Sequence, residues 1–174
     1  MKHPELLSLH SVSDLRISPG TSRCAFLVHT PCEAENNYET HLYVSDFTVS
    51  YPIGMSGITS FAWVDDAALA VGRPSADSTQ FALLSLKDGS EGTVWNIPFD
   101  ARIEGWVLGQ LLISARRPIT EEKAQEDGSW TILDELPIWE DGEGYRAKIR
   151  RQLFLCSYGG QPIRISPEEM DVRI

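Results

Sequence analysis

The sequence predicts an all-β fold: a partial β-propeller of about three four-stranded antiparallel blades, with a long insertion in the third. Two observations carry this prediction. Short apolar runs, such as CAFLV (24–28) and ALAVG (68–72), recur between glycine, proline and Asp-Gly turn signals. Ile17, Trp63 and Trp106 also recur at steps of 46 and 43 residues, which match the roughly 40–50 residues of a four-stranded blade.

Each repeat unit is expected to hold two hairpins. The first hairpin of each unit is built from two short strands around a tight turn, and the second begins with a polar residue followed by an apolar run. The three first hairpins are LRISPGTSRCAFLV, SFAWVDDAALAVG and IEGWVLGQLLISA, and the second hairpins open with HLYVSDF (41–47), QFALLSL (80–86) and QLFLCSY (152–158).

The repeats set the expected blade boundaries at 11–57, 58–99 and 100–167. The pattern D-[LV]-R-I occurs at 14–17 and again at 171–174, so residues 168–174 are expected to begin a fourth blade. The third step is 68 residues long, which equals one blade plus an insertion from Pro118 to Arg151. Propellers typically need four to eight blades to close, so we expect this chain to be part of a longer protein.

Composition narrows the classes of partner. The net charge is −10 and the pI is about 4.8, which argues against nucleic acid and anionic membranes, since both attract positive surfaces. The three cysteines, Cys24, Cys32 and Cys156, show no C-x-x-C spacing, and the N-terminus has no apolar signal region. A cytoplasmic location is the expectation.

No catalytic, cofactor-binding or metal-binding residue is expected within the chain. Ser157 lies before Tyr-Gly-Gly, but a nucleophile elbow needs glycine where Leu155 stands, and a strand rather than a helix follows. We therefore interpret Ser157 as the end of a strand. The acidic turns around Gly128 and Gly142 lack the ligand positions of a calcium loop. The histidines and cysteines have no zinc-ligand spacing.

Two segments resemble the propellers of the prolyl oligopeptidase family. The family's blade opening, D-x-R-x-S-P-D-G-x-x-x-A-F, is matched except that no aspartate stands between Pro19 and Gly20, and the second unit has Val64-Asp65-Asp66 in place of S-P-D-G. TolB-like propellers share this opening. A second segment resembles the L-P-x-x-x-D-G-x-G-Y…L-F stretch of the acylaminoacyl-peptidase and dipeptidyl-peptidase branch. The matching residues are Asp14, Arg16, Ser18, Pro19, Gly20, Ala25 and Phe26 in the first segment, and Leu136, Pro137, Asp141, Gly142, Gly144, Tyr145, Leu153 and Phe154 in the second.

The resemblance implies a non-catalytic part of a serine peptidase. In that family a propeller covers a C-terminal α/β-hydrolase domain, which holds the catalytic residues and receives short peptides. The implied roles of this chain are to gate peptide access and to dock the hydrolase domain. The alternative is a stand-alone TolB-like interaction module. Open sheet edges also predict self-association.

The insertion holds the candidate substrate-access residues Trp139, Tyr145 and Arg146. It is rich in charge, with Glu121, Glu122, Lys123, Glu126 and Asp127, so it is expected to project from a blade. The planar fork of Arg146 suits a peptide carboxylate. The alternative is that the basic run 146–151 pairs with nearby acidic residues or is simply solvated. Trp63 and Trp106 are expected in the core.

Overall fold

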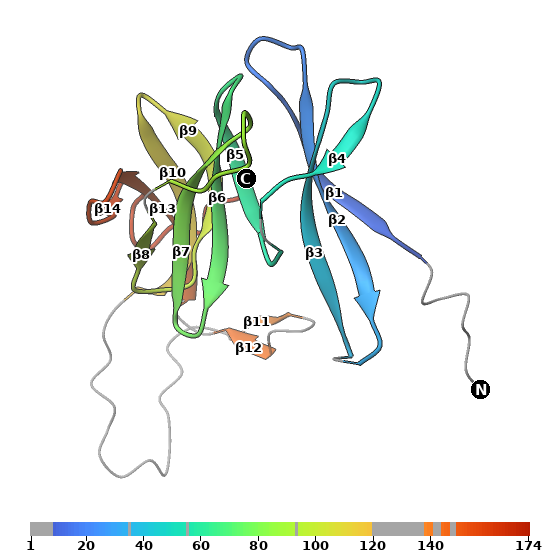
Figure 1. Ribbon diagram of the computed structural model, residues 1–174. Coiled ribbons are helices and arrows are strands. Elements are labelled where there is room, and N and C mark those ends of the chain that lie inside the picture. The colour runs from blue at the N-terminus through green and yellow to red at the C-terminus, as the bar shows by residue number, and fades with distance from the viewer. Residues whose placement is uncertain are drawn as a thin grey trace, which may run out of the picture.

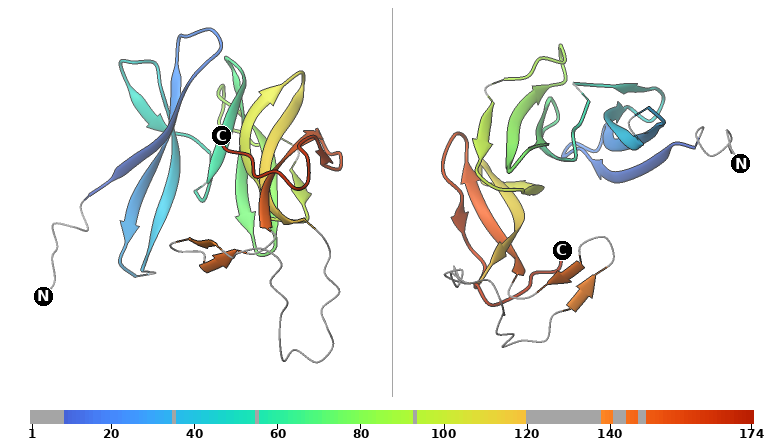
Figure 2. Two further views of the ribbon diagram at one scale, coloured as in Figure 1. Left: turned by 180° about the vertical axis from the view of Figure 1, so that it is seen from behind. Right: turned by 90° about the horizontal axis from the view of Figure 1, so that it is seen from below.

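The computed structural model describes residues 9–34, 36–54, 56–92, 94–119, 138–140, 144–146 and 149–174, with 138–140 and 144–146 described by their backbone alone. All regular structure in these residues is β-strand. Three four-stranded antiparallel sheets stand side by side along an arc (Figures 1 and 2). The predicted all-β class and partial propeller are therefore confirmed. No helix in the described residues is long and apolar enough to cross a membrane.

The strands of each sheet follow one another along the chain, as in a propeller blade. Sheet 1 contains β1 (Ser11–Ile17), β2 (Cys24–Cys32), β3 (Asn37–Ser45) and β4 (Ser50–Pro52). Sheet 2 contains β5 (Ser60–Asp65), β6 (Ala68–Ser75), β7 (Ser78–Ser85) and β8 (Trp95–Ile97). Sheet 3 contains β9 (Arg102–Val107), β10 (Gln110–Pro118), β13 (Ile149–Ser157) and β14 (Ile163–Arg164).

Tight turns explain why these hairpins form where the sequence predicts them. Leu108 and Gly109 alone connect β9 to β10, and both have positive φ, at 50° and 78°. A two-residue turn with two positive φ angles twists in the same sense as the flanking strands. The glycine takes this conformation readily, whereas Leu108 adopts it with its side chain 97% exposed.

The connection from β10 to β13 contains the small hairpin of β11 (Ile138–Glu140) and β12 (Gly144–Arg146) (Figure 1). Both ends of the predicted insertion lie in strands, because Pro118 pairs with Ile149 and Arg116 with Arg151. Most of the segment between them lies outside the described residues. Its projection from the blade therefore stays a prediction.

Two hydrophobic cores lie between the sheets. The alternation of side chains along each strand sends one set of residues toward each neighbour, so sheet 2 is buried on both faces. The core between sheets 1 and 2 contains Ala25, Leu27, Leu42, Val44, Phe61, Trp63, Leu69, Val71, Ala82 and Leu84. The core between sheets 2 and 3 contains Ala62, Ala70, Phe81, Trp95, Ile97, Ile103, Leu111, Ile113, Phe154 and Cys156.

The strand register confirms that Ile17, Trp63 and Trp106 are equivalent positions. They lie opposite Cys24, Leu69 and Leu111 on the second strand of each sheet. Leu69 and Leu111 pack toward the preceding sheet. Trp63 is buried and Trp106 is partly buried against the core, as predicted. Within the described residues no sheet precedes sheet 1, and the equivalent Ile17 is 58% exposed.

The expected start of a fourth blade is not a strand in this structure. Residues 168–174 contain no strand, although the backbone N–H of Val172 donates to the carbonyl oxygen of Arg151 in β13, at 3.0 Å. The blade boundaries and the fourth blade stay predictions.

Candidate functional site

The first strands of the three sheets, β1, β5 and β9, contact one another along the inner side of the arc. Each has an irregular register: β1 between Ser13 and Arg16, β5 between Trp63 and Asp65, and β9 around Glu104. A bulge inserts one residue and redirects its side chain. The bulges of β1 and β9 contain the polar residues Asp14 and Glu104, whereas that of β5 contains Val64.

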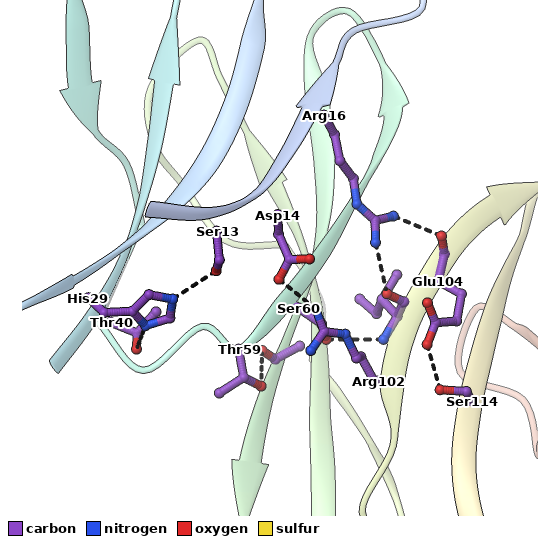
Figure 3. Close-up of polar contacts among 12 residues, drawn as sticks. Ser13, Asp14, Arg16, His29, Thr40, Thr59, Ser60, Arg102, Glu104 and Ser114 are labelled. Carbon is purple, nitrogen blue, oxygen red and sulfur yellow. Dashed lines mark hydrogen bonds and ion pairs between the residues drawn. The ribbon is translucent and has the colours of Figure 1, made fainter. Parts of the chain in front are cut away.

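Asp14 and Arg16 of β1 reach across β5 to β9 (Figure 3). Asp14 has φ 54°, a conformation that aspartate tolerates better than most residues. Its Oδ2 atom lies 2.5 Å from Nη2 of Arg102. Arg16 donates from Nη1 to the carbonyl oxygen of Glu104 at 2.8 Å. We call Asp14, Arg16, Arg102, Glu104 and Ser114 together the axis network.

Glu104 and Ser114 continue the axis network into sheet 3. Because of the bulge, Glu104 has no partner in the register with β10, and its carbonyl oxygen instead accepts a hydrogen bond from Arg16. The hydroxyl of Ser114 donates to Oε1 of Glu104 at 2.5 Å. The Arg16 guanidinium also stands 5.6 Å from the centre of the Phe61 ring, within the range of a cation–π contact. The network therefore links all three sheets.

A pocket of about 430 Å³ adjoins this network at the end of the sheets where β5 and β9 begin. The polypeptide between β10 and β13 leaves and re-enters the sheet at the same end, because Pro118 closes β10 and Ile149 opens β13. We call this cavity the arginine pocket. Its polar lining residues are Thr59, Asp100, Arg102, Ser114, Arg116 and Arg151.

Three arginines, Arg102, Arg116 and Arg151, line this pocket. Arginine presents five N–H donors in a planar fork that matches the two oxygens of a carboxylate or phosphate. The charge of the pocket is opposite to that of the chain, which is −10 overall. Sequence reasoning missed this pocket, because its arginines, Arg102, Arg116 and Arg151, lie far apart along the sequence. The available signal is a pair of Arg-Arg doublets, 116–117 and 150–151, at the ends of two strands.

Sequence reasoning also missed a serine–histidine contact in sheet 1. The Oγ atom of Ser13 lies 2.8 Å from Nε2 of His29, and the Oγ1 atom of Thr40 lies 3.0 Å from Nδ1 of the same ring (Figure 3). The third group is a neutral hydroxyl, whereas a catalytic triad uses a carboxylate to stabilise the imidazolium. We interpret the contact as a bridge that ties β1, β2 and β3 together.

Asp66 compensates for the aspartate that is missing from the first blade opening. Its Oδ1 atom accepts a hydrogen bond from the Gly20 backbone N–H at 2.7 Å, and its carbonyl accepts one from Arg23 at 3.3 Å. A Cβ atom at position 20 would come within 2.3 Å of the Asp66 carboxylate. A side chain at position 20 would displace the Asp66 carboxylate, whose hydrogen bond ties the turn of sheet 1 to sheet 2.

The backbone of the predicted substrate-access residues forms the β11–β12 hairpin. Trp139 pairs with Tyr145, and Ile138 pairs with Arg146. Their side chains lie outside the described residues, as do those of the acidic residues proposed to pair with the basic run, so both hypotheses stay predictions.

Ser157 is the last residue of β13, as predicted, and its Oγ atom accepts a hydrogen bond from Gln110 at 2.8 Å. Among described residues, no cluster of metal-ligating side chains occurs.

The fold is similar to the propellers of known peptidases. An acylaminoacyl peptidase in complex with Z-Gly-Gly-Phe-chloromethyl ketone matches with a TM-score of 0.70 and 17% identity over 91% of this chain. The uncomplexed acylaminoacyl peptidase of Pyrococcus horikoshii matches with a TM-score of 0.67 and 16% identity over 90% of this chain. The β-propeller domain of the Trilobed protease from Pyrococcus furiosus, described as having an open velcro topology, matches with a TM-score of 0.52 and 13% identity over 89%.

The chain spans only part of these proteins: 25% of each acylaminoacyl peptidase chain and 43% of the Trilobed protease chain. No family model matches the sequence, and no curated protein matches it. At these identities the likeness establishes a propeller-type fold. It agrees with the resemblance that the blade openings indicated.

Proposed function

We propose that the chain is the non-catalytic propeller segment of a prolyl oligopeptidase-family serine peptidase. In this role it docks against an α/β-hydrolase domain of the same protein and limits the access of peptides to the active site there. The observation that carries the proposal is the match of 91% of the chain to an acylaminoacyl peptidase at a TM-score of 0.70. Fold alone does not determine function, so the local features of the site supply the second argument.

The end of the sheets where β5 and β9 begin is the proposed peptide-facing end. It holds the arginine pocket and the two ends of the β10–β13 connection, in which the candidate access residues Trp139, Tyr145 and Arg146 lie. Loops on a rigid scaffold commonly carry recognition. Gating then needs a connection long enough to narrow the entrance, and the segment between Pro118 and Ile149 meets that need.

The first test is the reading frame beyond the codon for Ile174. The proposal requires further blades followed by a hydrolase domain with a G-x-S-x-G nucleophile elbow. A stop codon at that point would instead favour the stand-alone TolB-like module. Sequencing the complete transcript distinguishes the two outcomes without any assay of activity.

The second test measures size selectivity in the full-length protein. Residues 121–135 are replaced by a short Gly-Ser linker, and Tyr145→Ala and Arg146→Ala are made separately. If the connection gates access, kcat/KM should rise several-fold for long peptides and change little for short ones. Leu108→Ala, at the opposite end of β10, is the matched control and should leave both values unchanged. Wild-type kinetics in all three variants would contradict the gating role.

We also propose a cytoplasmic location, which the cysteines support. Cys24, Cys32 and Cys156 are all free thiols, and burial raises the pKa of the Cys156 thiol, which keeps it protonated and unreactive at neutral pH. Fractionation of cells that produce the natural protein, followed by mass spectrometry of its thiols, tests this location. Recovery in the secreted fraction would contradict it.

A further inference from the structure

Sheets 1 and 3 contact each other directly, although sheet 2 lies between them in the arc. β5 contacts both β1 and β9 along the inner side of the arc. The bulge in β1 brings Asp14 across β5 to sheet 3, where its Oδ2 atom lies 2.5 Å from Nη2 of Arg102 (Figure 3). Arg16 makes a second link, because its Nη1 atom donates to the carbonyl oxygen of Glu104 at 2.8 Å. Two polar contacts therefore span the inner side and skip one sheet.

The Asp14–Arg102 ion pair is much weaker than the interfaces between neighbouring sheets. Each of those interfaces is a buried hydrophobic core. The side chains of Asp14 and Arg102 are instead 23% and 51% exposed. An ion pair exposed to this degree changes an equilibrium by up to about 5-fold. The pair is therefore too weak to hold the fold together, but it is strong enough to favour one angle between the packed sheets over another.

The backbone of Asp14 opposes the ion pair. Its φ of 54° lies in the left-handed region, which costs free energy in every residue other than glycine, although less in aspartate than in most. Such a conformation persists only while the surrounding structure holds it. When the contact with Arg102 breaks, the bulge is free to relax. A favourable ion pair and an unfavourable backbone conformation thus meet at one residue, which gives two arrangements of similar free energy.

We propose that Asp14 and Arg102 form a latch that keeps the arc narrow on its inner side and opens when the ion pair is screened or broken. Sheet 1 then turns away from sheet 3 about its interface with sheet 2, in a hinge movement. Trp63 keeps β1 attached to β5, because its Nε1 atom donates to the carbonyl oxygen of Arg16 at 3.0 Å. The Arg16 guanidinium keeps its cation–π contact with Phe61 of sheet 2. The latch does not depend on the proposed peptidase role.

The test measures the distance between sheets 1 and 3 by electron–electron double resonance of two spin labels on the 174-residue chain. The labels are attached at Thr48→Cys in the β3–β4 turn and Leu108→Cys in the β9–β10 turn, both of which are exposed. Cys32→Ser removes the partly exposed native thiol, whereas Cys24 and Cys156 are buried and stay. At low salt this labelled protein should give one main distance.

Asp14→Asn and Arg102→Gln, each made in the labelled protein, should populate a second distance. Asparagine has the shape of aspartate and tolerates the same positive φ, so Asp14→Asn changes mainly the charge. The second distance should differ from the first by at least about 2 Å, the scale of sliding between packed elements. The ratio of the second arrangement to the first should rise by up to about 5-fold.

Two further measurements connect this change to the ion pair. The double variant should resemble either single variant, because all three lack the same interaction. Salt at about 1 M should open the labelled protein without further substitution, because it reduces the Debye length to about 3 Å. The same salt should change Asp14→Asn and Arg102→Gln little.

Arg164→Gln is the matched control. It removes the 3.0 Å ion pair of Arg164 with Glu168, which is also partly exposed but joins two residues close together in sequence. The control should keep the single main distance, and circular dichroism and urea unfolding check that every variant remains folded. An unchanged distance in Asp14→Asn and Arg102→Gln would overturn the inference. An equal change in Arg164→Gln, or additive changes in the double variant, would also overturn it.

Discussion

Replacing Glu91 by alanine should strongly destabilise sheet 2, because it leaves Arg73 without its ion-pair partner. Arg73, on β6, is a buried residue whose side chain is 10% exposed, and that of Glu91 is 15% exposed. Nη1 of Arg73 donates to Oε2 of Glu91 at 2.9 Å, and Nη2 contacts the other carboxylate oxygen. Nε of Arg73 donates to the carbonyl of Ser56 at 3.4 Å, so the pair also holds the connection that leads into β5.

The size of the effect follows from burial. Removing one partner of a buried ion pair costs about 3–5 kcal/mol, because the remaining charge is not compensated. Glu91 keeps some contact with solvent, which places the expected loss for Glu91→Ala near the lower limit, at about 3 kcal/mol. For a chain of this size each kcal/mol lowers the melting temperature by about 2–4 °C, so we expect a decrease of roughly 6–12 °C.

Urea unfolding followed by tryptophan fluorescence measures this loss, and a variant that removes both charges isolates its cause. Arg73→Met combined with Glu91→Leu removes both charges and should recover most of the stability, since an apolar pair of similar volume replaces a buried ion pair at little cost. A loss below about 1 kcal/mol in Glu91→Ala would mean that solvent screens the pair like a surface salt bridge. A double variant no more stable than Glu91→Ala would equally refute the reasoning.

Three further predictions concern single positions, each measured by denaturant or thermal unfolding. Gly20→Ala should cost about 0.5–1.5 kcal/mol, because the new Cβ would displace the exposed Asp66 carboxylate and break its hydrogen bond; an unchanged midpoint would contradict this. Leu108→Asn should stabilise the β9–β10 turn by up to about 1 kcal/mol, since asparagine tolerates the positive φ better than leucine; a loss of stability would show that the turn is not strained. Hydrogen bonds from backbone N–H groups, that of Val49 first, hold the pKa of Asp46 below its ordinary value. The stability that ionised Asp46 contributes is therefore fully present at pH values above the ordinary pKa and is lost as the pH falls through the lowered pKa. Asp46→Asn should flatten this part of the plot of stability against pH, and a plot identical to that of the wild type would contradict the assignment.

The sheets could be predicted from the sequence because each strand carries its own signal. The alternation in CAFLV places Ala25 and Leu27 on one face, and that face is the one buried against sheet 2. The repeat spacing aligned Ile17, Trp63 and Trp106 before any register was known, since a fixed blade length returns the chain to the same position of the fold. Local patterns of this kind do not depend on how the sheets are placed relative to one another.

The axis network and the arginine pocket depend on that relative placement. Asp14 and Arg102 are 88 residues apart in sequence, and only the bulge in β1 and the packing of three sheets bring them together. Arg116 and Arg151 lie opposite each other only because of the register between β10 and β13. That register could not be predicted, because the sequence of the segment between these two strands does not indicate which of their residues pair. Besides the two Arg-Arg doublets, Ser114 is a local sign of the site, because it is a polar residue in an apolar run.

The outward faces of the end sheets determine the symmetry of any self-association. Among the described residues, no sheet covers the face of sheet 1 that carries Ile17 and the Phe26–Tyr43 ring stack, whose centroids are 5.9 Å apart. This face corresponds to the Trp63 face of sheet 2. In the same described part of the chain, no sheet covers the face of sheet 3 that points away from sheet 2 and carries the partly buried Leu112 and Leu155. Because the two faces differ, copies joined through them associate head to tail rather than about a two-fold axis. Such contacts close into a ring when the rotation between copies divides the circle, and otherwise they continue as an open filament.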